Sequence, residues 1–61
     1  MIRVWVRWPN EQDWKIEVPI FRNLTAARAY VRDMRRLEPS VTREVRKWVA
    51  DETTGGKFVK V

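Results

Sequence analysis

The chain has 61 residues, of which 13 are basic and 8 acidic, and it contains neither histidine nor cysteine. These counts exclude disulfides and a zinc-type metal site, and they remove the commonest general acid and base of enzymes. No apolar run approaches the 18 or so residues that a membrane span needs. We therefore expect one small cytoplasmic domain over residues 1–61, without cofactor or metal, that is not an enzyme.

Apolar residues occupy every second position at the start of the chain. One face of this first segment carries Ile2, Val4, Val6 and Trp8. A period of two predicts a strand with one buried face. After the polar turn 9–13 the alternation resumes, with Trp14, Ile16, Val18 and Ile20 on the face expected to be buried. The two segments predict a hairpin, in which Pro19 lacks an amide donor and indicates a strand end or an edge strand.

The period then changes to that of a helix. Residues 24–37 carry apolar side chains at helical spacing, namely Leu24, Ala27, Tyr30, Val31, Met34 and Leu37. Asn23 or Thr25 is the expected N-cap. Glu38 precedes a proline and is pushed out of the helical region, so the helix should end there.

Residues 42–51 are rich in β-branched and aromatic residues, with Val45 and Val49 on the expected buried face. Lys47 shares their parity, which weakens that assignment. A turn at 53–56 and a short strand at 57–61 complete a ββαββ order. A right-handed crossover gives an α+β fold whose four-stranded antiparallel sheet has the order 2-1-3-4. One helix covers one face, and the other face stays open.

All of the net charge lies in the middle of the chain. Residues 22–47 hold eight basic side chains against three acids, whereas the flanks together hold five of each. At 100° per residue, four helix arginines share an arc of roughly 100°: Arg28, Arg32, Arg35 and Arg36. Like charges at i,i+4 repel slightly, and arginine suits phosphate through its planar fork, so this stripe predicts an anionic partner. The alternative is a solvated helix face.

A second surface is predicted on the open face of the sheet. It combines arginines with aromatic rings and is flanked by Lys15 and Glu17; its members are Arg3, Trp5, Arg7, Arg46 and Trp48. This layout resembles that of sheets that stack single-stranded bases. Two alternatives remain: a structural pair of Trp5 and Trp48 with arginines stacked on the rings, and a protein interface such as a homodimer.

Two pairs of carboxylates lie beside turns, Glu11 with Asp13 and Asp51 with Glu52. Neither pair has a nucleophile or base at a spacing typical of a catalytic site. Binding is therefore the expected function. The leading hypothesis is a small basic module that binds DNA or RNA through the helix arginines and the sheet tryptophans. The alternative is a protein–protein interaction module, either a homodimer or a small inhibitor, that meets an acidic protein surface or uses the open sheet face.

Overall fold

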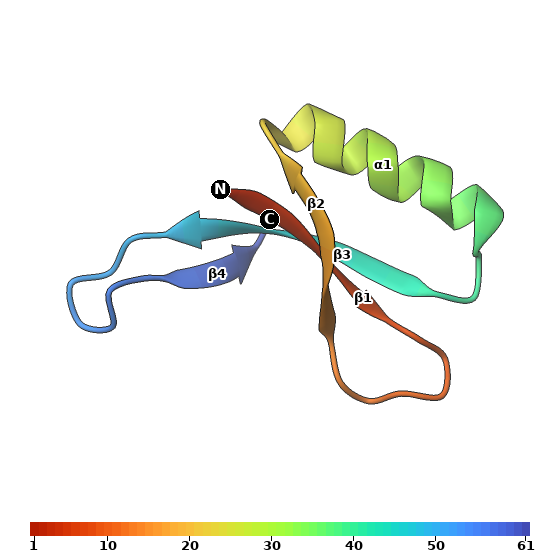
Figure 1. Cartoon of the computed structure of the whole chain (residues 1–61), viewed down its shortest axis with the longest axis horizontal. Coiled ribbons are helices and arrows are strands. Elements are labelled where there is room, and N and C mark those ends of the chain that lie inside the picture. The colour runs from red at the N-terminus through yellow and green to blue at the C-terminus, as the bar shows by residue number, and fades with distance from the viewer.

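The computed structural model describes all 61 residues and has the predicted ββαββ order (Figure 1). Its elements are β1 (Ile2–Arg7), β2 (Lys15–Phe21), α1 (Leu24–Leu37), β3 (Thr42–Val49) and β4 (Lys57–Lys60). The strands form one antiparallel sheet in the order β2-β1-β3-β4, and α1 packs on one face of it. The α+β class and the strand order are thus confirmed, and Pro19 lies on an edge strand as expected.

The ends of α1 follow from local chemistry. Asn23 is extended, and its side-chain oxygen accepts a 2.8 Å hydrogen bond from the amide of Ala26, so Asn23 is the N-cap. At the other end Glu38 leaves the helical region before Pro39, and its amide donates to the carbonyl of Met34. Arg35 and Arg36 lie in the last turn, where positive charge complements the helix dipole.

The core is small and lies between α1 and the two central strands. Its buried side chains are Val4, Val6, Ala27 and Val45. Val4 and Val45 face each other across β1 and β3, and Ala27 lets the helix approach them closely. Half-buried residues pack around this centre, including Ile2, Leu24 and Val31. The apolar stripe of the helix was expected to be buried, but its members Val31 and Met34 are only half-buried.

The fold is more extended than its mass implies. Its accessible surface is 4720 Å², whereas a folded monomer of 7.4 kDa is expected to expose about 4,200 Å². The radius of gyration is 12.3 Å, against about 10.5 Å for a compact chain of this length. The cause is visible in Figure 1, where the β3–β4 hairpin extends away from the helix, and α1 contacts β1, β2 and β3 but not β4.

The predicted inward face of β2 is wrong. Ile16, Val18 and Ile20 are 44%, 89% and 63% exposed. The register pairs Ile20 with Arg3 and Ile16 with Trp5. The pairing is irregular between these positions, because β2 advances by four residues where β1 advances by two. These apolar side chains therefore share the face of Trp5, which α1 does not cover, and Glu17 points toward the helix instead.

The prediction that Val49 is buried is also wrong, and so is the inward placement of Trp8. Val49 has the same parity as Val45, but it lies at the end of β3 that extends beyond α1. Trp8 follows the last residue of β1. Parity alone does not bury a side chain where no second layer covers the sheet.

The core assignment can be tested with one substitution at two positions of β3. Val45→Ala should lower the free energy of unfolding by about 1–3 kcal/mol, because it removes buried methyl groups and leaves a cavity. Val49→Ala is the matched control and should cost less than about 1 kcal/mol. Denaturant unfolding measures both, and equal losses would contradict this position of the core.

Candidate functional site

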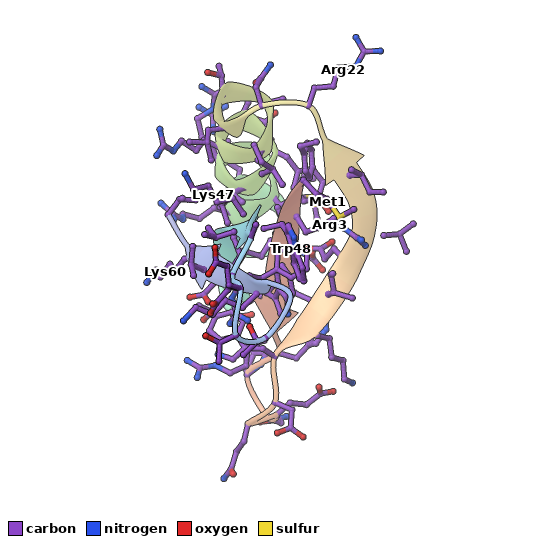
Figure 2. All side chains as sticks on the ribbon, turned by 90° about the vertical axis from the view of Figure 1, so that its left-hand side faces the viewer. Met1, Arg3, Arg22, Lys47, Trp48 and Lys60 are labelled. Carbon is purple, nitrogen blue, oxygen red and sulfur yellow. The ribbon has the colours of Figure 1, made fainter.

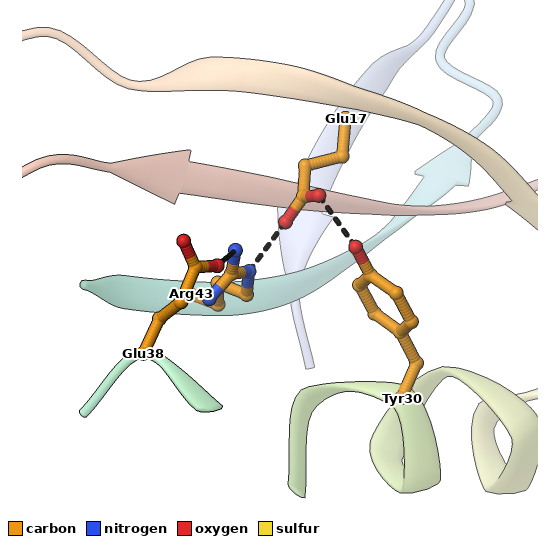
Figure 3. A network of polar contacts seen from close by, with 4 residues as sticks. All are labelled: Glu17, Tyr30, Glu38 and Arg43. Carbon is orange, nitrogen blue, oxygen red and sulfur yellow. Dashed lines mark hydrogen bonds and ion pairs between the residues drawn. The ribbon is translucent and has the colours of Figure 1, made fainter. Parts of the chain in front are cut away.

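A polar network joins the helix to the sheet beside the apolar core (Figure 3). Arg43 of β3 has a side chain that is only 4% exposed, and its Nε donates to Glu17 Oε1 of β2 at 2.5 Å. Its Nη2 donates to Glu38 Oε1, at the C-cap of α1, at 2.6 Å. The hydroxyl of Tyr30 donates to the second oxygen of Glu17 at 2.6 Å. The network therefore fixes β2, β3 and both the middle and the end of α1.

The charge states follow from this geometry. Burial lowers the pKa of Arg43, but the hydrogen bonds to Glu17 and Glu38 outweigh it, so the net shift is upward. Burial, and then the hydrogen bond to Glu17, raise the pKa of Tyr30. Arg43 is thus a charged residue whose charge is already balanced inside the fold. It belongs to the basic middle of the chain but is not available to a ligand.

The helix arginines differ from Arg43 because they face solvent. Arg28, Arg35 and Arg36 are exposed, and no carboxylate lies within ion-pair distance of them. Arg32 has one weak contact, with Nε 3.4 Å from Asp33 Oδ1, and both side chains are well exposed. The structure therefore places the four predicted helix residues on one accessible surface.

Arg28 and Arg35 also line a groove of about 450 Å³ bounded by α1, β3 and the end of the chain. Its basic side chains are Arg7, Arg28, Arg35, Arg43 and Lys60. Glu44 is its one acid, and it already pairs with Arg46 and Lys60. Arg43 is already balanced by Glu17 and Glu38, so the uncompensated positive charge of the groove comes from Arg7, Arg28 and Arg35, and it attracts anions. Lys60 was not predicted, although the short last strand that carries it was.

The predicted sheet-face residues come together, but mostly as a packed cluster. Trp5 and Trp48 do not pair directly; both contact Phe58 of β4, with ring centroids 4.6 and 5.2 Å apart. The guanidinium of Arg46 lies 4.7 Å from the centre of the Trp5 ring and 5.4 Å from that of Trp14. These contacts already occupy much of the aromatic surface.

The arginines of this face are similarly occupied. Arg46 forms a 2.6 Å ion pair with Glu44, and Arg3 donates to the main-chain carbonyl of Glu17 at 2.7 Å. Arg3 thereby bridges the irregular part of the β1–β2 pairing. Arg7 is exposed and lies over the Trp14 ring at 4.8 Å. The expected flanking position of Glu17 on this face is wrong, because its side chain joins the network on the helix side.

Trp48 has a further structural contact in the β3–β4 turn. Gly56 has a φ of +144°, and a Cβ at this position would overlap the Trp48 indole. The ring therefore packs directly on the glycine backbone while remaining 45% exposed. Phe58 and Trp14 were missing from the predicted site. Phe58 lies opposite Trp48 in the β3–β4 hairpin, so cross-strand pairing in that predicted hairpin was the available signal for Phe58.

Comparison with protein-family models, curated proteins and solved structures finds no significant match. No group of three or more acidic, histidine or cysteine side chains lies close enough to hold a metal ion. The single helix of 14 residues is too short and too polar to cross a membrane.

The network predicts a pH dependence that Tyr30→Phe should remove. The pKa of Tyr30 is raised above its ordinary value of 10.0, so the folded state holds this proton more tightly than the unfolded chain. The associated stability is complete below about pH 10 and is lost as the pH rises through the folded pKa. The unfolding free energy of the wild type should therefore fall more steeply above about pH 10 than that of Tyr30→Phe.

Denaturant unfolding at several alkaline pH values measures this difference. Tyr30 is the chain's only tyrosine, so phenolate absorbance follows its titration directly. Parallel pH profiles for the two proteins would show that folding does not raise the pKa of Tyr30, and would contradict its placement against Glu17.

Proposed function

We propose that this protein binds nucleic acid through phosphate contacts made by α1 and the adjoining groove. The observation that carries the proposal is the exposure of Arg28, Arg35 and Arg36 without acidic partners. Meanwhile Glu17, Glu38 and Glu44 are engaged by basic residues of the sheet. The net charge of +5 is therefore expressed mainly on the helix side of the molecule.

The spacing of the arginines suits a phosphate backbone. Arg28, Arg32 and Arg36 are four residues apart, which corresponds to about 6 Å along the helix for each step. A strand of B-form DNA carries a phosphate about every 3.4 Å along its axis, so a span of about 12 Å covers roughly three phosphates. Such contacts position a nucleic acid without reading its sequence. DNA and RNA both satisfy this chemistry.

Base stacking has a smaller part in this proposal than the sequence suggested. Phe58 and Arg46 cover Trp5, whereas Trp48 retains 45% exposure and is the ring best able to accept a base. Binding would then depend mainly on counterion release, which makes it strongly sensitive to salt. An acidic protein surface is the second candidate, because the same unpaired arginines would satisfy it.

The test compares two double variants that remove equal charge. Arg28→Gln with Arg35→Gln should reduce the slope of log affinity against log salt by roughly two units, about one for each lost phosphate contact. Lys47→Gln with Lys57→Gln is the matched control on β3 and β4, and its slope should stay close to that of the wild type. Fluorescence titration with labelled single-stranded DNA, duplex DNA and RNA provides the affinities.

Two results would overturn the proposal. The first is no binding to any of the three nucleic acids at low salt. The second is the same change of slope in both double variants, since this would show that overall charge, and not the helix surface, determines binding. Binding to an acidic polypeptide alone, lost in the arginine variant, would favour the second candidate.

A further inference from the structure

The groove between α1 and β3 contains a part of the β3 edge that no strand covers. β4 pairs with β3 only over residues 46–49, and beyond them the Val61 amide donates to the Val45 carbonyl at 3.1 Å. Figure 1 shows β3 continuing from there toward the end of α1 without β4 beside it. The first residues of β3 therefore have β1 on one side and the groove on the other.

This uncovered edge offers unpaired main-chain groups to the groove. The N–H and C=O of successive residues alternate between the two edges of a strand. Because the Val45 carbonyl points toward Val61, the N–H and C=O of Arg43, two residues earlier, point the same way. The side chain of Arg43 is engaged in the polar network, but its main chain has no strand partner on this side. One donor and one acceptor of β3 thus remain free.

The walls of the groove carry the charge. Arg28 and Arg35 of α1 and Arg7 of β1 line it, and all three are exposed and lack a carboxylate partner. Lys60 is balanced by Glu44 at 3.7 Å, and Figure 2 shows Lys60 on the side of the sheet away from β2. Arg28 and Arg35 are seven residues apart, which is about 10.5 Å along the helix. A ligand that satisfies both must carry several negative charges along its length.

We propose that the groove holds a single strand of nucleic acid, with phosphates against Arg28 and Arg35 and an unpaired base edge against the main chain of Arg43. This inference rests on the proposed function and specifies its substrate. A phosphodiester strand supplies the repeated negative charge, and unpaired bases expose donors and acceptors on their Watson–Crick edges. In a duplex those edges are bonded to each other, so a duplex reaches the arginines but leaves the β3 main chain unpaired.

An acidic peptide added as a further strand fits the groove less well. Strand addition depends on a row of main-chain hydrogen bonds along an exposed edge, and strands usually have at least about three residues. On either side of Arg43 the edge is already in use, because the Val41 amide donates to the Glu38 carbonyl and the Val45 carbonyl accepts from Val61. A base edge needs no more than the one donor and one acceptor that remain.

The groove divides the helix arginines into two sets. Arg28 and Arg35 line it, whereas Arg32 and Arg36 do not, although all four are exposed. Arg35 and Arg36 are adjacent residues in the last turn of α1, and neither has a carboxylate partner. They form a matched pair of equal charge, of which only Arg35 contacts a strand bound in the groove.

Fluorescence titration at one salt concentration tests the proposal with a labelled single-stranded oligonucleotide and a duplex of the same sequence. Arg35→Gln should weaken single-strand binding at least about fivefold more than Arg36→Gln, whereas the two variants should weaken duplex binding equally. An abasic strand of the same length keeps the phosphates but has no bases. The wild type should bind it at least about fivefold more weakly than the complete strand.

Equal losses of single-strand binding in Arg35→Gln and Arg36→Gln would overturn this inference and leave nucleic-acid binding through α1 intact. An abasic strand that binds as tightly as the complete strand would do the same. No binding of either nucleic acid at low salt would reject the proposed function and this inference together. Tighter binding of poly-glutamate than of the single strand would assign the groove to an acidic polypeptide instead. Circular dichroism should show unchanged secondary structure in both variants, because both side chains are exposed.

Discussion

The structure depends on one buried guanidinium held between two carboxylates. Arg43 pairs in register with Val6, so its side chain lies on the covered face of the sheet, where water cannot solvate its charge. Glu17 and Glu38 balance that charge from β2 and from the end of α1. Loss of one partner of such a buried pair typically costs about 3–5 kcal/mol, because the remaining charge is left without compensation. That is a large fraction of the stability expected of so small a domain.

This network also determines what the two outer surfaces of the protein carry. Because Glu17 turns inward to reach Arg43 and Tyr30, its neighbours Ile16 and Val18 must turn outward. The exposed apolar row of β2, formed by Ile16, Val18 and Ile20, is therefore a consequence of the polar contact inside. Because Glu17 and Glu38 both pair with Arg43, they do not neutralise the arginines of α1. One internal arrangement thus accounts for an apolar surface on one side and a basic surface on the other.

Much of the fold could be predicted because its signals are local. Asparagine is a favoured N-cap residue, so Asn23 indicates where the helix begins, and Pro39 indicates where it ends. The face of β1 was predictable because its alternating positions are apolar on one side and mainly charged on the other. In β2 the alternation was equally regular, but here it predicted the wrong face. Glu17, which alternates with the apolar residues, faces inward because it pairs with a buried side chain, and the apolar residues therefore face outward. That partner, Arg43, lies 26 positions further along the chain. The helix arginines were correctly expected to be exposed, whereas the covering of Trp5 by Phe58 and Arg46 depends on pairing between β1, β3 and β4.

The central claim is that Glu17, and not its apolar neighbours, faces the helix. Nuclear Overhauser contacts in solution test this directly, because Tyr30 provides the only phenol ring and lies on α1. The structure predicts contacts from the Tyr30 ring to the side-chain protons of Glu17 and none from the methyl groups of Val18 to α1. Contacts between Val18 and the helix, with Glu17 in solvent, would mean that β2 presents its other face to the helix. They would contradict both the polar network and the exposure of Ile16, Val18 and Ile20.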